Sequence, residues 1–272
     1  MPALFELNHQ IPIIDASRYG KAYGQVSHDP TDPRAGEPLV LLDTVKVAYC
    51  SYHARTDGDN PPYHRALRGS RKDTWLRAGA AASLARVNEK LNPFGYEVFV
   101  LDGYRSVECQ QALYDFYFEQ GRSTVDDPTD EACHAYANQF VRNTSRFSPT
   151  NSNAWPAHST GAAVDITLRS LSTGELVDMG SPFEEMSETS HNDYFERQLL
   201  AGTIGKTDPR LWHRRLAHWA LESEDWVNSP WVFWHYDLGN QLYVQMRRHL
   251  GGPAPEAAWY GYIEEPPRIS PA

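Results

Sequence analysis

A carboxylate inside an aliphatic strand pattern is the feature that most constrains this chain. Residues 163–168 read Ala-Val-Asp-Ile-Thr-Leu. Because side chains alternate between the two faces of a strand, Val164, Ile166 and Leu168 share one face and Asp165 lies on the other. The aliphatic face has to be buried, so the face that carries Asp165 is expected to open toward a cleft. The pattern therefore predicts a sheet with one face against the core and a polar site on the other.

Two histidines are candidates for the same cleft. His158 precedes the strand, and Gly161 lets the chain bend so that the imidazole of His158 can approach Asp165. His235, in the aromatic run 233–237, is the strongest candidate for a third ligand. Two imidazoles and a carboxylate form an open zinc site of the catalytic type, although the same donors also serve non-haem iron(II). The structural alternative is buried histidines that only satisfy their own hydrogen bonds.

Length and composition narrow the class of protein. The 272 residues fit one large domain spanning 1–272, and the net charge of −10 disfavours a nucleic-acid partner. No stretch approaches the ~20 apolar residues of a membrane span, and the N-terminus has no signal-peptide pattern. The three cysteines are spaced for neither a disulfide framework nor a thiolate zinc site. We therefore expect a cytoplasmic protein without a membrane or nucleic-acid partner.

Helical and strand patterns are mixed without regular alternation, which predicts an α+β fold rather than a doubly wound parallel sheet. Residues 1–60 are expected to form an extended arm with short strands at 40–42 and 45–49, and residues 263–272 a Pro-rich tail. Helices are predicted over 73–91 with Asp73 as N-cap, from near Ser106, around 130–142 and around 206–222. Strands are predicted over 96–101 and 163–168, with a last pair over 231–237 and 240–247.

Arg105 follows the predicted strand 96–101, and binding groups often gather at strand ends. Its guanidinium could hold a carboxylate or stabilise an oxyanion. It could instead form an ion pair with Asp102 or Glu108. The sequence alone leaves both interpretations open.

Several ordered blocks together carry a family resemblance. The chain resembles the D-alanyl-D-alanine dipeptidases of the vancomycin-resistance type, zinc peptidases related in fold to D,D-carboxypeptidases and the Hedgehog signalling domain. The resemblance spans roughly residues 60 to 262, with blocks at 60–63, 101–106, 158–165, 180–187, 234–237 and 258–261. It implies a central antiparallel sheet with flanking helices, and zinc (Zn2+) on His158, Asp165 and His235.

The resemblance also implies roles in substrate binding. Arg105 would polarise the scissile carbonyl or stabilise the developing oxyanion, and Glu184 would pair with the free ammonium of the substrate. Tyr104 and Ser159, which lie in the matching blocks, are further substrate-binding candidates. The implied substrates are small dipeptides that end in D-alanine.

The chain departs from the family pattern at the general base. The family's catalytic glutamate stands three residues before the last histidine ligand, and this position is Val232 here. Valine cannot accept a proton, and losing a general base costs ~10²–10⁴-fold in rate. Asp237 shares strand parity with His235, so its carboxylate could face the same cleft. We therefore expect Asp237 to replace the missing glutamate as the catalytic base. Other candidates for a replacement are Glu184, Glu185, Tyr236, His191 and His213.

Two other departures also concern the substrate rather than the metal. Pro156 replaces a serine of the family pattern, and Glu184 replaces an aspartate that is one methylene shorter. We therefore expect a zinc enzyme acting on a small dipeptide-like or amino-acid-derived amide. The reaction would be hydrolysis with an unusual base or a non-hydrolytic step, such as cyclisation or acyl transfer in specialised metabolism. The alternative is an inactive zinc-containing module that binds a peptide or D-amino acid.

Overall fold

The structure, a computed structural model, describes residues 8–15 and 22–266. Parts of the expected N-terminal arm (1–7 and 16–21) and of the Pro-rich tail (267–272) lie outside the described residues. Within the described part, no helix combines the length and the apolar character that crossing a bilayer requires.

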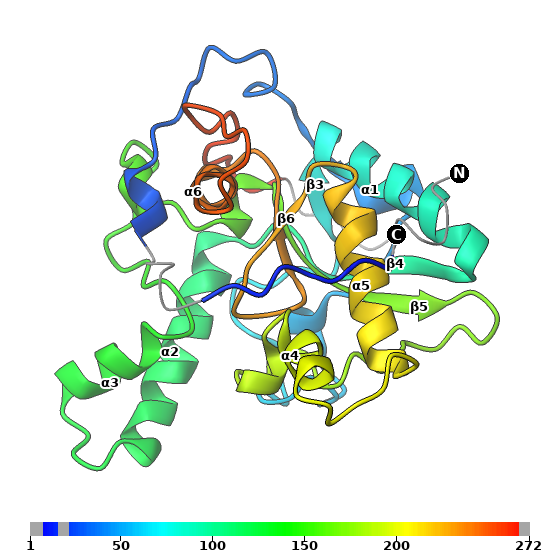
Figure 1. Ribbon diagram of the computed structural model, residues 1–272. Coiled ribbons are helices and arrows are strands. Elements are labelled where there is room, and N and C mark those ends of the chain that lie inside the picture. The colour runs from blue at the N-terminus through cyan, green and yellow to red at the C-terminus, as the bar shows by residue number, and fades with distance from the viewer. Residues whose placement is uncertain (1–7, 16–21, 267–272) are drawn as a thin grey trace.

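A five-stranded sheet in the order β2-β4-β5-β7-β6 forms the centre of the molecule (Figure 1). Its strands are β2 (Ala48–Tyr49), β4 (Tyr96–Asp102), β5 (Ala163–Ser170), β7 (His235–Asp237) and β6 (Val227–Asn228). All neighbouring pairs are antiparallel except β2 and β4, which are parallel. A separate two-stranded sheet pairs β1 (Leu39–Leu41) with β3 (Trp75–Arg77). The α+β class and the largely antiparallel central sheet are thereby confirmed.

Six helices accompany the sheet in the described part of the chain. They are α1 (Ala78–Leu91), α2 (Val107–Thr124), α3 (Asp130–Ala137), α4 (Tyr194–Leu200), α5 (Pro209–Glu222) and α6 (Gln241–His249). Figure 1 shows α2 and α3 together on one side of the molecule, away from α1 and α5. Helix α2 begins next to Ser106, near the predicted start, and the Ser106 hydroxyl caps it by accepting a hydrogen bond from the backbone N–H of Cys109.

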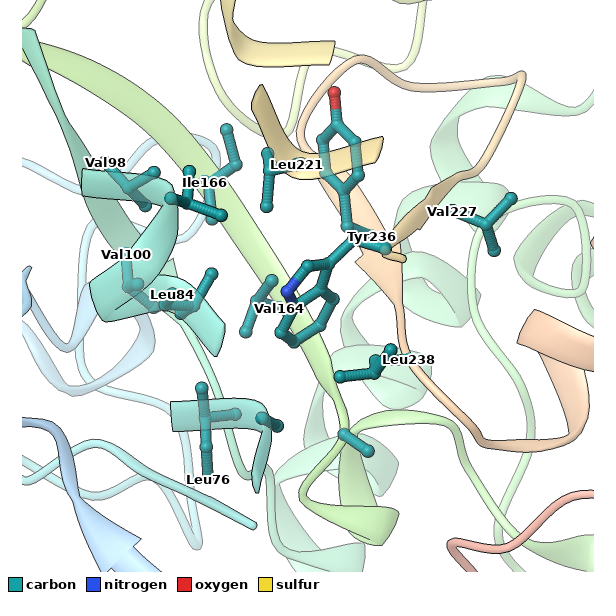
Figure 2. Packing of buried hydrophobic residues seen from close by; sticks show 14 of the residues in the cluster. Leu76, Leu84, Val98, Val100, Val164, Ile166, Leu221, Val227, Tyr236 and Leu238 are labelled. Carbon is teal, nitrogen blue, oxygen red and sulfur yellow. The ribbon is translucent and has the colours of Figure 1, made fainter. Parts of the chain in front are cut away.

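The aliphatic face of β5 is buried, as its alternation predicts. Val164 and Ile166 are inaccessible to solvent and lie in the main core cluster, beside Val98 of β4. Leu84 of α1 and Leu221 of α5 belong to the same cluster (Figure 2). Full burial of each such side chain contributes ~1.5–3 kcal/mol relative to exposure. This packing fixes which way β5 faces, and so turns Asp165 away from the core.

Several predicted elements differ in the structure. Of the strand predicted over 45–49 only Ala48–Tyr49 is a strand, and of the strand predicted over 231–237 only His235–Asp237. The helix expected from Asp73 begins only at Ala78, because Trp75–Arg77 pairs as β3 with β1. The helix expected over 130–142 ends at Ala137. The last predicted strand, 240–247, is wrong because this segment is helix α6, which begins where the Asn240 side chain accepts a hydrogen bond from the N–H of Tyr243.

Candidate metal centre

The register of two neighbouring strands brings Asp165 and His235 together. Asp165 of β5 is the direct cross-strand partner of His235 of β7, and directly opposed side chains on one face lie close enough to interact. His158 reaches the same point from a short 3₁₀ turn (His158–Thr160) that ends at Gly161. Gly161 has φ +70°, and a Cβ there would lie 2.4 Å from Leu39 Cδ2, so the bend requires glycine.

The three predicted ligands converge on one point. One donor atom from each of His158, Asp165 and His235 lies within 4.8 Å of the others. His158 Nε2 is 3.2 Å from His235 Nδ1 and 3.4 Å from Asp165 Oδ2, and His235 Nδ1 is 2.9 Å from Asp165 Oδ1. All three are well covered, with Asp165 only 3% exposed. The structure thus brings together residues from two strands and a turn that are up to 77 positions apart.

The outer nitrogen of each imidazole is held by a fixed acceptor. His158 Nδ1 donates to the carbonyl oxygen of Gly103 at 2.8 Å, and His235 Nε2 donates to Asp237 Oδ2 at 3.0 Å. With these protons placed outward, His158 Nε2 and His235 Nδ1 present lone pairs to the shared point. Metal-binding histidines are typically oriented in this way by a carbonyl or carboxylate. The donor set therefore fits a divalent cation such as zinc.

The electrostatics of the cluster also favour a cation. Burial alone would lower the pKa of His235, but Asp237 and Asp165 outweigh it and raise the pKa to about 10. Burial would raise the pKa of Asp165, yet His158 and His235 hold the pKa well below its usual range. The two buried carboxylates, Asp165 and Asp237, thus stabilise positive charge at this position, whether a proton on His235 supplies it or a metal ion takes the place of that proton.

Arg105 forms ion pairs both with Asp165, one of the three predicted ligands, and with Asp102. Its Nη2 lies 2.6 Å from Asp102 Oδ2 and 3.2 Å from Asp165 Oδ2, and its Nη1 donates to Gln110 Oε1 at 3.0 Å. The ion pair with Asp102 considered from the sequence therefore forms. Glu108 instead lies near Arg68. Arg105 still lines the cavity described below, so its guanidinium is held rigidly beside the metal centre.

Glu184 is a buried carboxylate with three partners. Its Oε1 lies 3.3 Å from His53 Nε2, while its Oε2 accepts hydrogen bonds from the hydroxyls of Tyr63 at 3.0 Å and Tyr117 at 3.3 Å. The backbone of Glu184 has φ +67°, a conformation that L-residues rarely adopt. A strained backbone that turns a carboxylate inward is typical of a functional position.

One cavity of about 510 Å³ connects these groups. The metal-centre residues, Arg105 and Glu184 line it, and most of its remaining wall is apolar or aromatic. This volume lies in the range of ~300–1,000 Å³ that is usual for small-molecule sites. Apolar wall residues come from α2, the segment after α3, the β6–β7 connection and α6, namely Leu113, Tyr117, Phe140, Val141, Trp231, Val232, Trp234 and Leu242.

Three predicted catalytic or substrate-binding residues, Asp237, Ser159 and Tyr104, lie outside this wall. The same holds for four other residues considered as replacement bases, namely Glu185, Tyr236, His191 and His213. Asp237 is fully buried behind His235, with Oδ1 accepting a hydrogen bond from Asn240 Nδ2 at 2.6 Å. The Ser159 hydroxyl donates to the carbonyl oxygen of Arg105 at 2.8 Å, and the Tyr104 hydroxyl donates to the carbonyl oxygen of Ile263 at 3.2 Å. In this arrangement Ser159 and Tyr104 hold the backbone around the site.

Sequence reasoning missed two side chains near the site. His53 lies buried between Glu184 and Asp102, with Nδ1 3.6 Å from Asp102 Oδ2. Arg142 lines the cavity from the segment after α3. Neither residue stands in a motif with metal-ligand spacing, and only the tertiary structure brings them to the site.

A family comparison agrees with this geometry. A family model described as D-ala-D-ala dipeptidase, of the M15 peptidases, matches residues 70–250. The chain belongs to the D-alanyl-D-alanine dipeptidase family. This dipeptidase-family protein is 28% identical over 244 residues to a D-alanyl-D-alanine dipeptidase of Synechocystis, covering 84% of this chain and 93% of the relative. It is 30% identical over 149 residues to a D-alanyl-D-alanine dipeptidase of Enterococcus faecalis, covering 55% and 65% respectively.

Two solved structures align with parts of this dipeptidase-family protein. VanYB in complex with D-alanine-D-alanine aligns over 68% of this chain and 83% of that chain, with 14% identity and a TM-score of 0.36. The LdcB LD-carboxypeptidase aligns over 81% and 77%, with 15% identity and a TM-score of 0.39.

Proposed function

We propose that this chain is a zinc-dependent enzyme that binds a small dipeptide-like amide and activates its carbonyl group. The observation that carries the proposal is the convergence of His158, Asp165 and His235 with both outer imidazole nitrogens already held by acceptors. A structural histidine pair would not need both lone pairs turned toward one carboxylate. Zinc bound there would supply Lewis-acid polarisation of a carbonyl oxygen.

Two residues are proposed to position the substrate. Arg105, fixed by Asp102 and Gln110, would donate to the carbonyl oxygen as negative charge develops on it. Glu184, aimed into the cavity and fixed by two tyrosine hydroxyls, would attract the ammonium group of the ligand. Because their partners hold both groups in place, little reorganisation would accompany binding.

The general base is the unusual part of the proposed reaction. The acidic residues that line the cavity are Asp165 and Glu184. Asp165 belongs to the metal centre, and Glu184 is engaged by three partners. Asp237 lies behind His235, which supports an orienting role rather than the role of base. With Val232 in the wall, we propose slow hydrolysis or a step driven by a nucleophile within the substrate, since the apolar wall excludes water.

The same observation supports a second candidate, a zinc-containing binding module without turnover. The two carboxylates that line the cavity, Asp165 and Glu184, already have partners. A ligand could therefore be held there without a free carboxylate to act as general base. Under this alternative the pocket, Arg105 and Glu184 would serve recognition alone.

Metal analysis followed by calorimetry and product analysis separates these proposals. Purified protein is expected to contain close to one zinc per chain, and His235→Ala protein to lose it. Zinc-loaded protein is then titrated with D-alanyl-D-alanine and incubated with it in ¹⁸O-labelled water. Labelled free D-alanine supports hydrolysis, and unlabelled cyclic or transfer products support the non-hydrolytic step. Binding without any product supports the module. A protein that takes up no metal refutes both.

A further inference from the structure

Arg142 contributes a guanidinium to the cavity wall and has no carboxylate partner among the residues that the structure describes. Two arginines line this cavity. Arg105 is matched by Asp102 and Asp165, whereas Arg142 forms no ion pair with any residue that the structure describes. The chain carries 35 acidic and 25 basic residues. Carboxylates are therefore abundant, and a shortage of them does not explain why Arg142 lacks an ion pair. An unmatched charge in a pocket wall is a binding group for an anion.

The side chain of Arg142 is held in place by neutral contacts. Its Nη1 donates to the carbonyl oxygen of Asn153 at 2.6 Å, and its guanidinium carbon lies 4.1 Å from the ring centroid of Tyr23. A guanidinium has five N–H donors, so these contacts leave donors for a ligand. Stacking on an aromatic ring also fixes the plane of the fork without neutralising its charge.

The backbone of Arg142 is tied to the metal centre through Gln110. Gln110 Nε2 donates to the carbonyl oxygen of Arg142 at 3.3 Å, while Gln110 Oε1 accepts from Arg105 Nη1 at 3.0 Å. Pro156 and Ala157, which directly precede His158, line the same cavity. Arg142 therefore faces the ligand space that the metal centre also borders.

We propose that Arg142 binds the terminal carboxylate of the ligand through a charge-assisted hydrogen-bonded pair. The inference rests on the proposed function and assigns the residue that recognises the carboxylate of a dipeptide-like ligand. Together with Glu184, Arg142 would give the cavity one group of each sign for a zwitterionic ligand. A neutral amide terminus would forfeit the charge-assisted part of this contact.

Calorimetry on the zinc-loaded full chain tests this inference with two probes, D-alanyl-D-alanine and D-alanyl-D-alaninamide. Wild type is expected to bind the acid about ten-fold or more tightly than the amide. Arg142→Gln should reduce that preference to less than about three-fold, mainly by weakening the acid. Arg142→Lys keeps the charge and should retain part of the preference. Arg146→Gln is the matched control, since Arg146 is exposed and lies outside the cavity wall, and should behave as wild type.

The ratio of the two affinities is measured within each variant, so it does not depend on the fraction of protein that folds. Equal binding of both probes by wild type, or an unchanged preference in Arg142→Gln, overturns the inference and leaves the proposed function standing. A zinc-loaded wild type that binds neither probe overturns both.

Discussion

Installing a carboxylate at position 232 tests the reasoning about the missing base most directly. Val232 is half-buried in the cavity wall and stands three residues before His235, which contributes a donor to the candidate metal centre. The carboxylates already present in that wall, Asp165 and Glu184, are committed to other partners. We therefore expect the Val232→Glu variant to gain a proton acceptor that the wild type lacks.

The expected size of the gain follows from the contribution of a positioned general base. Such a base accelerates a reaction by ~10²–10⁴-fold, which corresponds to ~3–5 kcal/mol of barrier at ~1.4 kcal/mol per ten-fold. Because Val232 is half-buried, replacing it costs ~1 kcal/mol or less in stability through lost apolar burial. The rate effect should thus greatly exceed the effect on folding.

The assay is release of D-alanine from D-alanyl-D-alanine by zinc-loaded protein. Val232→Glu should raise kcat/KM at least ~100-fold over wild type. Val232→Gln is the matched control, because glutamine has nearly the same size but does not accept the proton, and it should give no gain. Suppose that Val232→Glu binds zinc and the dipeptide as wild type does yet hydrolyses no faster than Val232→Gln. In that case, valine at position 232 would not be what limits hydrolysis, and the prediction would be refuted.

Three further predictions concern the metal centre and its surroundings. Asp237→Asn should weaken zinc binding ~10–100-fold, measured by competition with a chromophoric chelator, because it loosens the outer hydrogen bond of His235; an unchanged affinity would argue against an orienting role. Removing zinc with a chelator should lower Tm by ~5–10 °C when zinc had been present at ~100 times its Kd, and the shift should be absent in His158→Ala. Burial lowers the pKa of His53, but Asp102 and Glu184 outweigh it and raise the pKa to about 9. The raised pKa means that charged His53 stabilises the fold fully below about pH 6.5 and loses this effect as pH rises to about 9. Denaturant titrations should show wild type to be more stable than His53→Gln by up to ~3 kcal/mol at pH 6. This difference in unfolding free energy should disappear by pH 10, and a difference that does not change with pH would contradict the stabilising role of charged His53.

Much of the sheet and the identity of the metal-site candidates could be predicted from local patterns. Alternation in residues 163–168 predicted which face of β5 packs into the aliphatic core, because the side-chain period of a strand is fixed at two residues. Gly161 marked the bend before it, because only glycine tolerates the close approach of Leu39 at positive φ. Segment 240–247 was misread as a strand because its short run of apolar residues suits either period, and capping by Asn240 makes it a helix.

The sequence by itself determined which donors are present and which face of β5 carries Asp165, since both follow from residue type and local geometry. Only the tertiary structure decided the partners of those donors. Strand parity was compatible with Asp237 facing the cavity, yet packing places its carboxylate behind His235. Arg142 and His53 reach the site through contacts with Tyr23 and Glu184, which lie far from them in the chain. The physical reason is that periodicity is a short-range property of the backbone, whereas distances between remote side chains are set by how the whole core packs.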